Sequence, residues 1–576
     1  MPAPVPAPEV TTAGGFLLVL ALFVPVLGAL GAFTSGGRHV ERVAAVTIAL
    51  GLASVSGIVA GVLQSGTPLV YLLGGWAPPI GIALRADGPA VVMMAMAAGV
   101  VALVGVFAYA DFHTPAAMDE ARRPFAFWIL LMGVWAGLNA VFLAGDLFTL
   151  YVALELLTFA AVPLVSLDGR AETLAAALRY LLFALVGSIL YLAGAGLIYG
   201  DYGTLDIVLL AGQVRADPAT CAAVALMTVG LLAKTALFPL HLWLPPAHAG
   251  APAAASAVLS ALVVKGSFFI VVRLWFDVLP GLPGWTAAQL VAALGAAAIL
   301  FGNLVALRQA RLKLLIAYST VAQIGYLFLM FPLALGPGAR IEHGGALTGG
   351  ILQAMSHATA KAAMFMAAGL IYTALGHDRI AGLAGVGRAL PVSVLAFALG
   401  GLALMGVPPS GAYTAKALLV HAAGESGQWW WELVLDAGGF LTSAYLIVVL
   451  AHALAPAREP LAPLARVPLV REAAALALAL CSLSLGLIHW AAVLPDPSAV
   501  LSSPLTAGSF AKMLWPLLGG TVLAGLFGRW RDRPPRLGGV VDRTDLLLRH
   551  WPVAGLLLLL LLIALNAAIL AAGGGV

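Results

Sequence analysis

Long runs of apolar residues recur along the whole chain and are separated by short segments that hold most of the polar residues. An α-helix needs about 20 apolar residues to cross the hydrocarbon core of a bilayer, so this pattern predicts roughly sixteen membrane spans. The first run follows no basic segment, and we expect it to be a span rather than a cleaved signal peptide. The predicted spans are 14–33, 43–64, 87–110, 124–143, 146–166, 174–199, 219–243, 253–276, 287–307, 312–333, 347–375, 391–422, 434–455, 472–490, 513–528 and 551–571.

Proline interrupts two of these spans. The seventh span, 219–243, contains Phe238–Pro239 and is followed by Pro245–Pro246, and the twelfth, 391–422, contains Pro-Pro-Ser-Gly at 408–411. Proline removes a backbone donor, and an open backbone inside a membrane is tolerated only where protein buries it or where it lines a wet cavity. We therefore expect both breaks to lie at an internal, hydrated site.

The composition supports an integral membrane protein. Of the 576 residues, 62% are hydrophobic and 9% are charged, whereas a soluble domain has about 25% charged residues. The mean hydropathy is +1.03. These values exclude a soluble globule, a disordered chain and a nucleic-acid binder, and they indicate an all-α protein with many spans.

The polar segments leave little room for a cofactor. No loop is long enough for a folded nucleotide or flavin domain, and the two cysteines, Cys221 and Cys481, exclude a disulfide scaffold and a cysteine-ligated iron–sulfur cluster within this chain. The histidines do not stand beside carboxylates or cysteines at the spacing of a metal site. We therefore expect no cofactor, no metal and no catalytic redox centre.

Basic residues are distributed unevenly among the loops. The odd-numbered loops hold about twenty Lys and Arg residues and the even-numbered loops about five. Because cytoplasmic loops carry the excess of positive charge, we expect the odd-numbered loops in the cytoplasm and both termini on the outer face of a bacterial plasma (inner) membrane. The most basic segment, 529–549, is expected to be a cytoplasmic loop that contacts anionic lipid.

Most lysines of this chain lie inside predicted spans. There are six lysines, and four of them are in apolar helix: Lys234, Lys265, Lys361 and Lys416. A lysine at the centre of a membrane costs about 2.5–3.5 kcal/mol on insertion scales. Each must therefore be paired or face a hydrated interior, unless its side chain extends to the membrane surface.

Glu155 is the matching anion. It lies deep in the fifth span, and no other carboxylate is expected at a comparable depth. In a medium of low dielectric constant, a carboxylate near Lys234 favours the protonated amine, and its withdrawal favours release of the proton. A Glu155–Lys234 pair could thus act as a proton switch; a static structural ion pair is the alternative.

Histidines extend this series of ionisable residues. His357 precedes Lys361 by four residues, so both side chains are on one helix face. His241 and His248 flank the break in the seventh span. Because histidine titrates near neutral pH, all three are candidates for proton relay, and buried packing is the alternative.

Four stretches resemble one family of membrane proteins, the antiporter-like subunits of respiratory complex I, Mrp cation/proton antiporters and membrane-bound hydrogenases. Residues 233–248 resemble the seventh-helix signature, and three further stretches resemble the family's fifth, tenth and broken twelfth helices. In chain order the four read GDLFTLYVALEL (145–156), AKTALFPLHLWLPPAH (233–248), LKLLIAYSTVAQIGY (312–326) and GVPPSGAYTAKAL (406–418).

The resemblance implies a fold and a set of site residues. It implies about 14 core helices plus about two C-terminal ones, with two inverted five-helix repeats at 124–276 and 287–455, between N-terminal helices in 1–123 and C-terminal helices in 456–576. The proton-transfer residues that it implies are Glu155, Lys234, Lys265, His357, Lys361 and Lys416.

The implied function is that of a proton-translocating antiporter-like subunit of a complex I-like, hydrogenase-like or Mrp-like complex. Its partners would be other membrane subunits, and a partner module would supply the energy. Three alternatives remain at this point: a sodium/proton antiporter subunit without redox coupling, the membrane subunit of an inorganic-carbon uptake system, and a structural homologue that conducts nothing.

Overall fold

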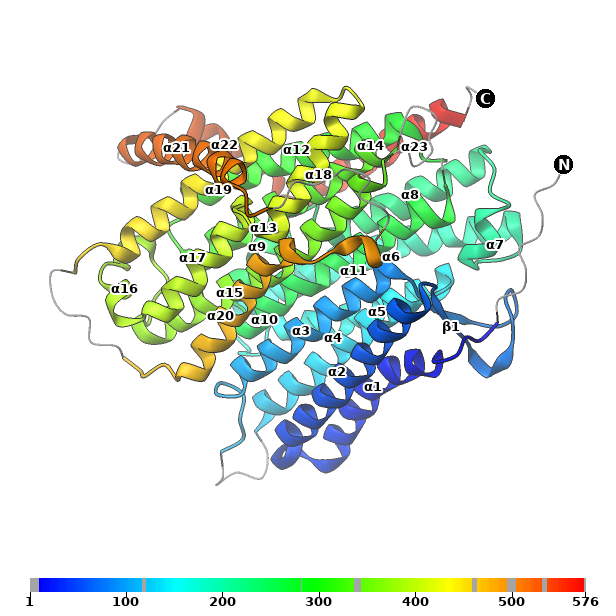
Figure 1. Cartoon of the computed structure of the whole chain (residues 1–576), viewed down its shortest axis with the longest axis horizontal. Helices are drawn as coiled ribbons and strands as arrows, with labels where there is room; N and C mark the ends of the chain where they lie inside the picture. Colours follow the sequence, from blue (N-terminus) through cyan, green and yellow to red (C-terminus); the bar gives the residue numbers. More distant parts are fainter. Residues whose placement is uncertain are drawn as a thin grey trace.

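The computed structural model describes residues 10–115, 121–280, 282–335, 343–457, 464–494, 504–530 and 536–573, and these form one bundle of long helices (Figure 1). Among them, fifteen helices are long and apolar enough to cross a membrane, and α17 is a shorter apolar helix. With α17 and α18 taken together as the interrupted twelfth span, the predicted set of spans is confirmed, and so is the all-α membrane fold class.

The first part of the bundle contains three spans and a small hairpin. In β1 and β2 the strands are antiparallel, with Leu69 opposite Ala86. The elements are α1 (Phe16–Ser35), η1 (Gly37–His39), α2 (Val40–Ser65), β1 (Leu69–Leu72), η2 (Leu73–Gly75), β2 (Ala83–Ala86) and α3 (Gly88–Ala108).

The middle of the chain forms two successive groups of helices. The first group is α4 (Arg122–Leu143), α5 (Leu147–Val165), α6 (Ala171–Tyr202), α7 (Ile207–Ala211), α8 (Pro218–Thr235), α9 (Leu244–Gly250), α10 (Ala253–Val258), η3 (Leu259–Val263), α11 (Val264–Arg273) and η4 (Leu274–Val278). The second is α12 (Gly284–Arg308), α13 (Leu312–Phe328), α14 (Met330–Ala334), α15 (Gly344–Leu375), η5 (Ile380–Gly382), α16 (Val386–Ala389), α17 (Pro391–Met405), α18 (Gly411–Glu425) and α19 (Trp429–Leu454).

The C-terminal part adds helices to the outside of these groups. Helix α20 packs on α15 and α17, α21 packs on α19, and α23 packs on α8 and α12. The elements are α20 (Leu469–Ser484), η6 (Leu485–Leu487), η7 (Trp490–Ala492), α21 (Ala507–Trp530), α22 (Arg536–Leu548) and α23 (Trp551–Gly573).

The loops gather at two opposite ends of the bundle. At one end, which we call the hairpin end, Gly145 donates a backbone hydrogen bond to Ala83 of β2 at 3.0 Å, and Ile207 donates one to Gly145 at 2.9 Å. At the other, the arginine-rich end, Leu312 donates to the carbonyl of Asp378 at 2.7 Å, and the Arg170 guanidinium donates to that of Gly250 at 2.9 Å. The spans thus run back and forth between these two ends.

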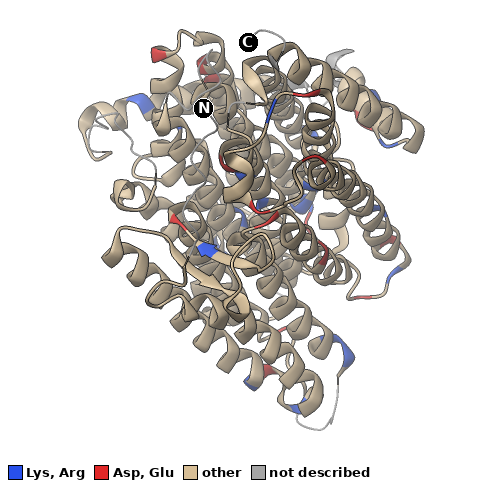
Figure 2. Ribbon diagram, turned by 90° about the vertical axis from the view of Figure 1, so that its right-hand side faces the viewer, with Lys and Arg blue, Asp and Glu red and all other residues tan. Residues whose placement is uncertain are grey.

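Charged residues are sparse along the helices themselves. Figure 2 shows that most of the ribbon carries neither acidic nor basic residues, and that many of the charged positions lie in loops and at helix ends. In a bilayer, a charge on the lipid-facing side of a helix is costly. The few charges within the bundle are therefore the positions that need an explanation.

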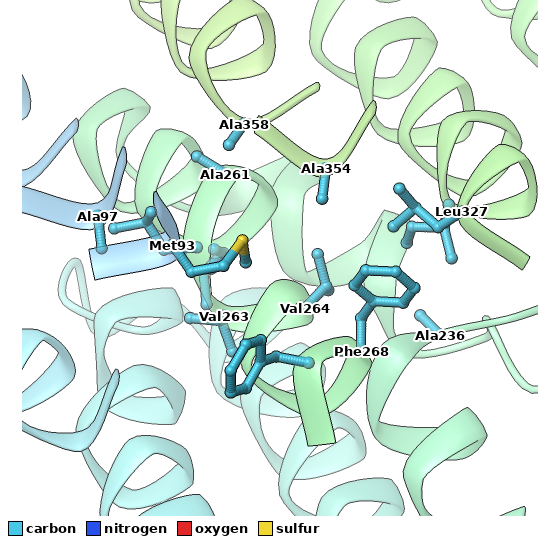
Figure 3. Packing of buried hydrophobic residues seen from close by; sticks show 14 of the residues in the cluster. Met93, Ala97, Ala236, Ala261, Val263, Val264, Phe268, Leu327, Ala354 and Ala358 are labelled. Atoms are coloured by element: carbon cyan, nitrogen blue, oxygen red, sulfur yellow. The ribbon is translucent and has the colours of Figure 1, made fainter. Parts of the chain in front are cut away.

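The eighth span crosses the centre of the protein. Helices α10 and α11 and the π-helical turns η3 and η4 form one continuous segment, and its span is buried throughout. Figure 3 shows Val264 and Phe268 of this segment among apolar side chains of other helices, including Met93 of α3 and Leu327 of α13. This close packing surrounds the polar groups of the segment with an apolar shell.

Facing glycines bring two pairs of helices into close contact. A Cβ atom on Gly230 of α8 would lie 2.3 Å from the carbonyl oxygen of Gly187 on α6, and one on Gly325 of α13 would lie 2.3 Å from that of Gly295 on α12. Small residues allow helix backbones to approach closely in a membrane. The first contact lies one turn before Lys234 and positions it beside α6.

Helix α22 corrects one expectation. Residues 529–549 were expected to form a cytoplasmic loop, but Arg536–Leu548 is a helix that packs on α12, while 531–535 lie outside the described residues. Its apolar residues Leu546 and Leu547 are exposed, whereas Asp545 is buried. Leu548 is buried as well, and Asp542 and Arg543 are exposed, so apolar and charged residues occur on both sides of this helix.

Candidate functional site

A buried ion pair joins α5 to α8. The Lys234 ammonium donates to Oε1 of Glu155 at 2.9 Å and to Oγ1 of Thr158 at 3.1 Å. The hydroxyl of Ser188, on α6, donates to the same oxygen of Glu155. Only 4% of the Lys234 side chain and 14% of the Glu155 side chain are exposed. The structure therefore places Glu155 against Lys234, as the sequence predicts.

The break after α8 fixes the position of Lys234. The helix ends at Thr235, and Ala236 has a φ of 60°, the left-handed conformation that commonly terminates helices. The indole of Trp243 donates to the Ala233 carbonyl at 3.0 Å and so satisfies a backbone group that the break leaves without a helical partner. Lys234 thus lies in the last turn of α8, where the helix dipole favours a cation.

Lys265 lies beyond this pair, on α11. It is fully buried, and its ammonium donates to the Ser260 carbonyl at 2.5 Å, within the π-helical turn η3. Thr235 connects α8 to this helix because its hydroxyl donates to Ser267 at 2.9 Å. Turns of this kind are often found at functional sites.

Lys361, on α15, is the second fully buried lysine of the centre. Its ammonium donates to the Ile316 carbonyl at 3.2 Å and to the hydroxyl of Ser319, both on α13. The neighbouring Thr320 and Ser260 share a hydrogen bond of 3.0 Å. We call Lys265 and Lys361 the central lysines; hydroxyl groups of η3 and α13 lie beside both of them.

The three histidines that are candidates for proton relay fall into two groups. His357 and His248 belong with the central lysines, because His357 lies one turn before Lys361 on α15 and His248 contacts Phe365, one turn after it. His357 is fully buried, and within the described residues neither of its ring nitrogens has a hydrogen-bond partner. His248 stacks on Phe365 of α15, with the ring centroids 4.8 Å apart. A buried imidazole of this kind can take up a proton only if water enters or if a movement of the helices exposes the ring.

His241 has different neighbours. Its ring stacks on Phe238, with the centroids 5.4 Å apart, and meets Phe301 of α12 edge-on at the same distance. Helix α12, which carries Phe301, also packs on α22. The structure therefore separates His241 from His248, although both flank the same break in the chain.

A second ion pair involves Lys416. Its ammonium donates to Oδ1 of Asp436, on α19, at 2.8 Å. The pair is more open than the first, since 25% of the Lys416 side chain and 39% of the Asp436 side chain are exposed. A cavity of about 20 Å³ adjoins Lys416 and is lined also by Gln353 and Gly406, which is room for one water molecule.

The expectation that Glu155 is the one deep carboxylate is wrong. Asp436 lies seven residues after the start of α19, and Asp545 is buried on α22. Asp436 is part of a predicted span, and that signal was available in the sequence. Asp545 had no such signal, because the basic residues around it are typical of a cytoplasmic loop.

Six ionisable residues were predicted to form the proton path, and the structure brings them into three groups: Glu155 with Lys234; Lys265 with His357 and Lys361; and Lys416 with Asp436. Hydroxyl and amide side chains lie between the groups, among them Gln323 and Gln353, which share a hydrogen bond of 2.8 Å. A line of polar groups thus extends through the apolar bundle, which is an arrangement that can carry protons when it is hydrated.

Comparisons with known proteins identify the family of this chain. Residues 144–442 match the family described as NADH:quinone oxidoreductase/Mrp antiporter, transmembrane. The chain is 34% identical to NADH-quinone oxidoreductase subunit N of Desulforudis audaxviator over 409 residues, which cover 70% of this chain and 78% of that protein. It is 29% identical to a Na(+)/H(+) antiporter subunit of Alkalihalophilus pseudofirmus over 442 residues, 76% of this chain and 86% of that protein.

A solved structure gives the same result for the fold. The Mrp complex from Dietzia sp. contains a chain that superposes with a TM-score of 0.73 and 26% sequence identity, covering 89% of this chain and 98% of that one. The matched family region contains both ion pairs and the central lysines. This chain therefore belongs to the NADH:quinone oxidoreductase/Mrp antiporter transmembrane family and is an antiporter-like membrane subunit of the proton-translocating type.

Proposed function

We propose that protons cross the protein by way of the line from Glu155 and Lys234, through the central lysines and His357, to Lys416. The observation that carries this proposal is the buried ion pair at 2.9 Å between Glu155 and Lys234. Two opposite charges in an apolar bundle are weak evidence for stability alone, because their desolvation offsets much of their attraction. Their position at a helix break, within an antiporter-like fold, favours a transport role.

The pair would act as a switch. While Glu155 is close, its negative charge stabilises the protonated form of Lys234. If Glu155 moves away, the amine is left in an apolar environment that disfavours its charge, and it releases its proton. Ser188 and Thr158 are hydrogen-bond partners that could hold either group while the pair is open.

The central lysines would pass the proton on. Within the described ranges, neither Lys265 nor Lys361 forms an ion pair with a carboxylate; each donates to backbone or hydroxyl oxygens instead. Two like charges in one apolar region repel each other, so binding of a proton by one favours its release by the other. His357 and His248 would exchange protons with these amines when water enters.

We further propose that two inverted repeats, 124–276 and 287–455, each contribute one broken helix. In this arrangement the arginine-rich end faces the cytoplasm, and the hairpin end, with both termini, faces the outside. The protein would work in a bacterial plasma membrane beside other membrane subunits, and a partner would move charge near Glu155 to supply the energy.

Sodium/proton exchange is the second candidate function, and the name of the Na(+)/H(+) antiporter protein of Alkalihalophilus pseudofirmus keeps it in view, although the comparisons do not favour it over the first. The two candidates differ in the driving force. The intact complex in proteoliposomes should move protons when an electron donor is oxidised if the first is correct. A pH change that needs only a sodium gradient would support the second.

The role of the ion pair is tested by Lys234→Met in the intact complex. Methionine has a similar length and no charge, so we expect assembly to persist and proton flux to be lost. Lys512→Met is the matched control, because Lys512 is an exposed lysine on α21. If Lys234→Met assembles and keeps the flux of the unmodified complex, the proposed path is wrong.

A further inference from the structure

Helix α22 carries charged residues on its inner side. Asp542, Asp545 and Arg549 are spaced at i, i+3 and i+7, which places them on one face. Asp542 is the outermost, and it binds Arg308 with a hydrogen bond of 2.9 Å to the guanidinium Nε. Half of the Asp542 side chain is exposed. Its partner Arg308 is the last residue of α12, so this contact lies at the arginine-rich end.

One turn further, Asp545 is buried against α13. The hydroxyl of Tyr318 donates to its two carboxylate oxygens at 2.9 and 3.0 Å. Arg549 donates to the Tyr318 hydroxyl at 2.8 Å and to Oδ2 of Asp545 at 2.6 Å. Only 12% of the Asp545 side chain is exposed. The three groups form a closed hydrogen-bonded cluster, which we call the α22 cluster.

The α22 cluster lies beside the broken seventh span. Helix α22 packs on α12, whose Phe301 meets the ring of His241 edge-on with the centroids 5.4 Å apart, and Trp551, two residues after Arg549, stacks on Phe183 of α6 with the ring centroids 5.4 Å apart. Helix α23 then packs on α8, which carries Lys234, and on α12. The C-terminal hairpin therefore brings a buried carboxylate and a cation to a region where His241 has aromatic neighbours.

The presence of a charged cluster inside a membrane protein requires an explanation, because it costs free energy. The Asp545 carboxylate is buried, although 42% of the Arg549 side chain is exposed; burying a carboxylate is costly, and apolar residues of similar size would often be as stable. Leu546 and Leu547 of the same helix are exposed, and Leu548 is buried. The inner face could have been apolar throughout, as it is at Leu548, yet it places Asp545 against Tyr318.

We propose that Asp545 is a further proton-transfer residue, which connects the arginine-rich end to His241. In this step the carboxylate of Asp545 accepts a proton from water, its pairing with Arg549 weakens, and the proton passes on toward the His241 imidazole, which restores the carboxylate. Tyr318 positions Asp545, and Arg549 returns it to its ionised form. This inference rests on the proposed function, because it adds an access route toward Lys234: His241 lies in the break after α8, and Trp243, two residues on, donates a hydrogen bond to the Ala233 carbonyl next to Lys234.

The test is Asp545→Asn together with the double variant Asp545→Asn/Arg549→Gln, in the intact complex. Asparagine still accepts the hydrogen bond from Tyr318 but carries no exchangeable acid proton, and the double variant leaves no unpaired charge. We expect both to assemble and to lose most of the proton flux, and we expect Asp545→Glu to restore part of it. Asp542→Asn, on the same helix, is the control and should leave the flux unchanged.

Two results would overturn the inference. An assembled double variant with the flux of the unmodified complex would show that no proton passes through Asp545. Loss of assembly in both Asn variants would assign the cluster a structural role only. Lys234→Met, measured in parallel, separates this from the proposed function: if that variant loses flux and the Asp545 variants keep it, only the access route fails.

Discussion

Lys416 of α18 and Asp436 of α19 form an ion pair at 2.8 Å, and it repeats the chemistry of Lys234 and Glu155 with one difference: it is partly open. The cavity beside Lys416 has room for a water molecule, and a pair that water reaches is screened and contributes little to stability, about 0–1 kcal/mol. The Glu155–Lys234 pair is more deeply buried and lacks this screening. The two ends of the line of lysines therefore combine similar groups with different access to water.

The open pair leads to a first prediction. Asp436→Asn should change the thermal stability of the complex little, by less than about 1 kcal/mol, because the pair is screened. It should nevertheless lower proton flux, because Lys416 loses the anion that stabilises its protonated form. Flux in proteoliposomes and thermal unfolding in detergent measure the two effects. Glu432→Gln, one turn earlier on α19, is the control; equal flux in both variants would contradict the prediction.

For the buried Glu155–Lys234 pair, replacing one residue and replacing both should change the stability of the complex by different amounts. Removing Lys234 alone leaves the Glu155 carboxylate buried without a counter-charge, and breaking a buried pair costs about 3–5 kcal/mol. We expect Glu155→Gln/Lys234→Met to be more stable than Lys234→Met, although neither should transport protons. Thermal unfolding of the assembled complexes tests this order. If the double variant is the less stable one, the two side chains do not compensate each other.

The glycine contact between α6 and α8 should be sensitive to one added carbon. In Gly230→Ala the new Cβ would lie 2.3 Å from the Gly187 carbonyl oxygen, so the helices must separate. Overpacking of this kind costs about 1–3 kcal/mol, and it should displace Lys234 and lower proton flux. Gly196→Ala on α6 is the matched control, because a Cβ there meets no atom within 4 Å. Equal stability of the two variants would argue against close packing.

Asp217 caps the helix that carries Lys234. The backbone amide of Thr220 donates to its carboxylate at 2.8 Å and holds the pKa of Asp217 below its ordinary value of 3.8, against the opposing effect of burial. A group whose pKa is lowered by folding stabilises the protein fully above its ordinary pKa, and this is lost as the pH falls through the lowered value.

We therefore expect Asp217→Ala to cost about 1 kcal/mol at neutral pH and progressively less in acid. Asp217→Asn should keep the cap, because asparagine also accepts the amide hydrogen bond, but without this pH dependence. Thermal unfolding across pH measures both. A pH-independent difference between Ala and the unmodified protein would show that the charge of Asp217 does not take part.

Much of the candidate site could be read from the chain because lipid restricts what a span can contain. A lysine such as Lys234 inside an apolar run needs a partner, and Glu155 is the deep anion of the neighbouring motif. Proline at 239 and 409 similarly predicts breaks that must be internal. These inferences need only the position of a residue along its own span.

Other contacts depend on which faces of distant helices meet. Asp436 is separated from Lys416 by twenty residues, and Asp545 from Tyr318 by more than two hundred. His241 and His248 lie seven residues apart but belong to different groups of charges. The pattern of apolar residues places each of these in or near a span without indicating its partner.

The amino-acid sequence by itself determined the number of spans, the two breaks and the burial of Lys234, Lys265 and Lys361, because each follows from the cost of exposing polar groups to hydrocarbon. The tertiary structure alone decided that Asp436 faces Lys416 and that α22 turns Asp545 inward to Tyr318. Rotation of a helix about its axis is set by packing against its neighbours, and a side chain finds its partner only when those neighbours are in place.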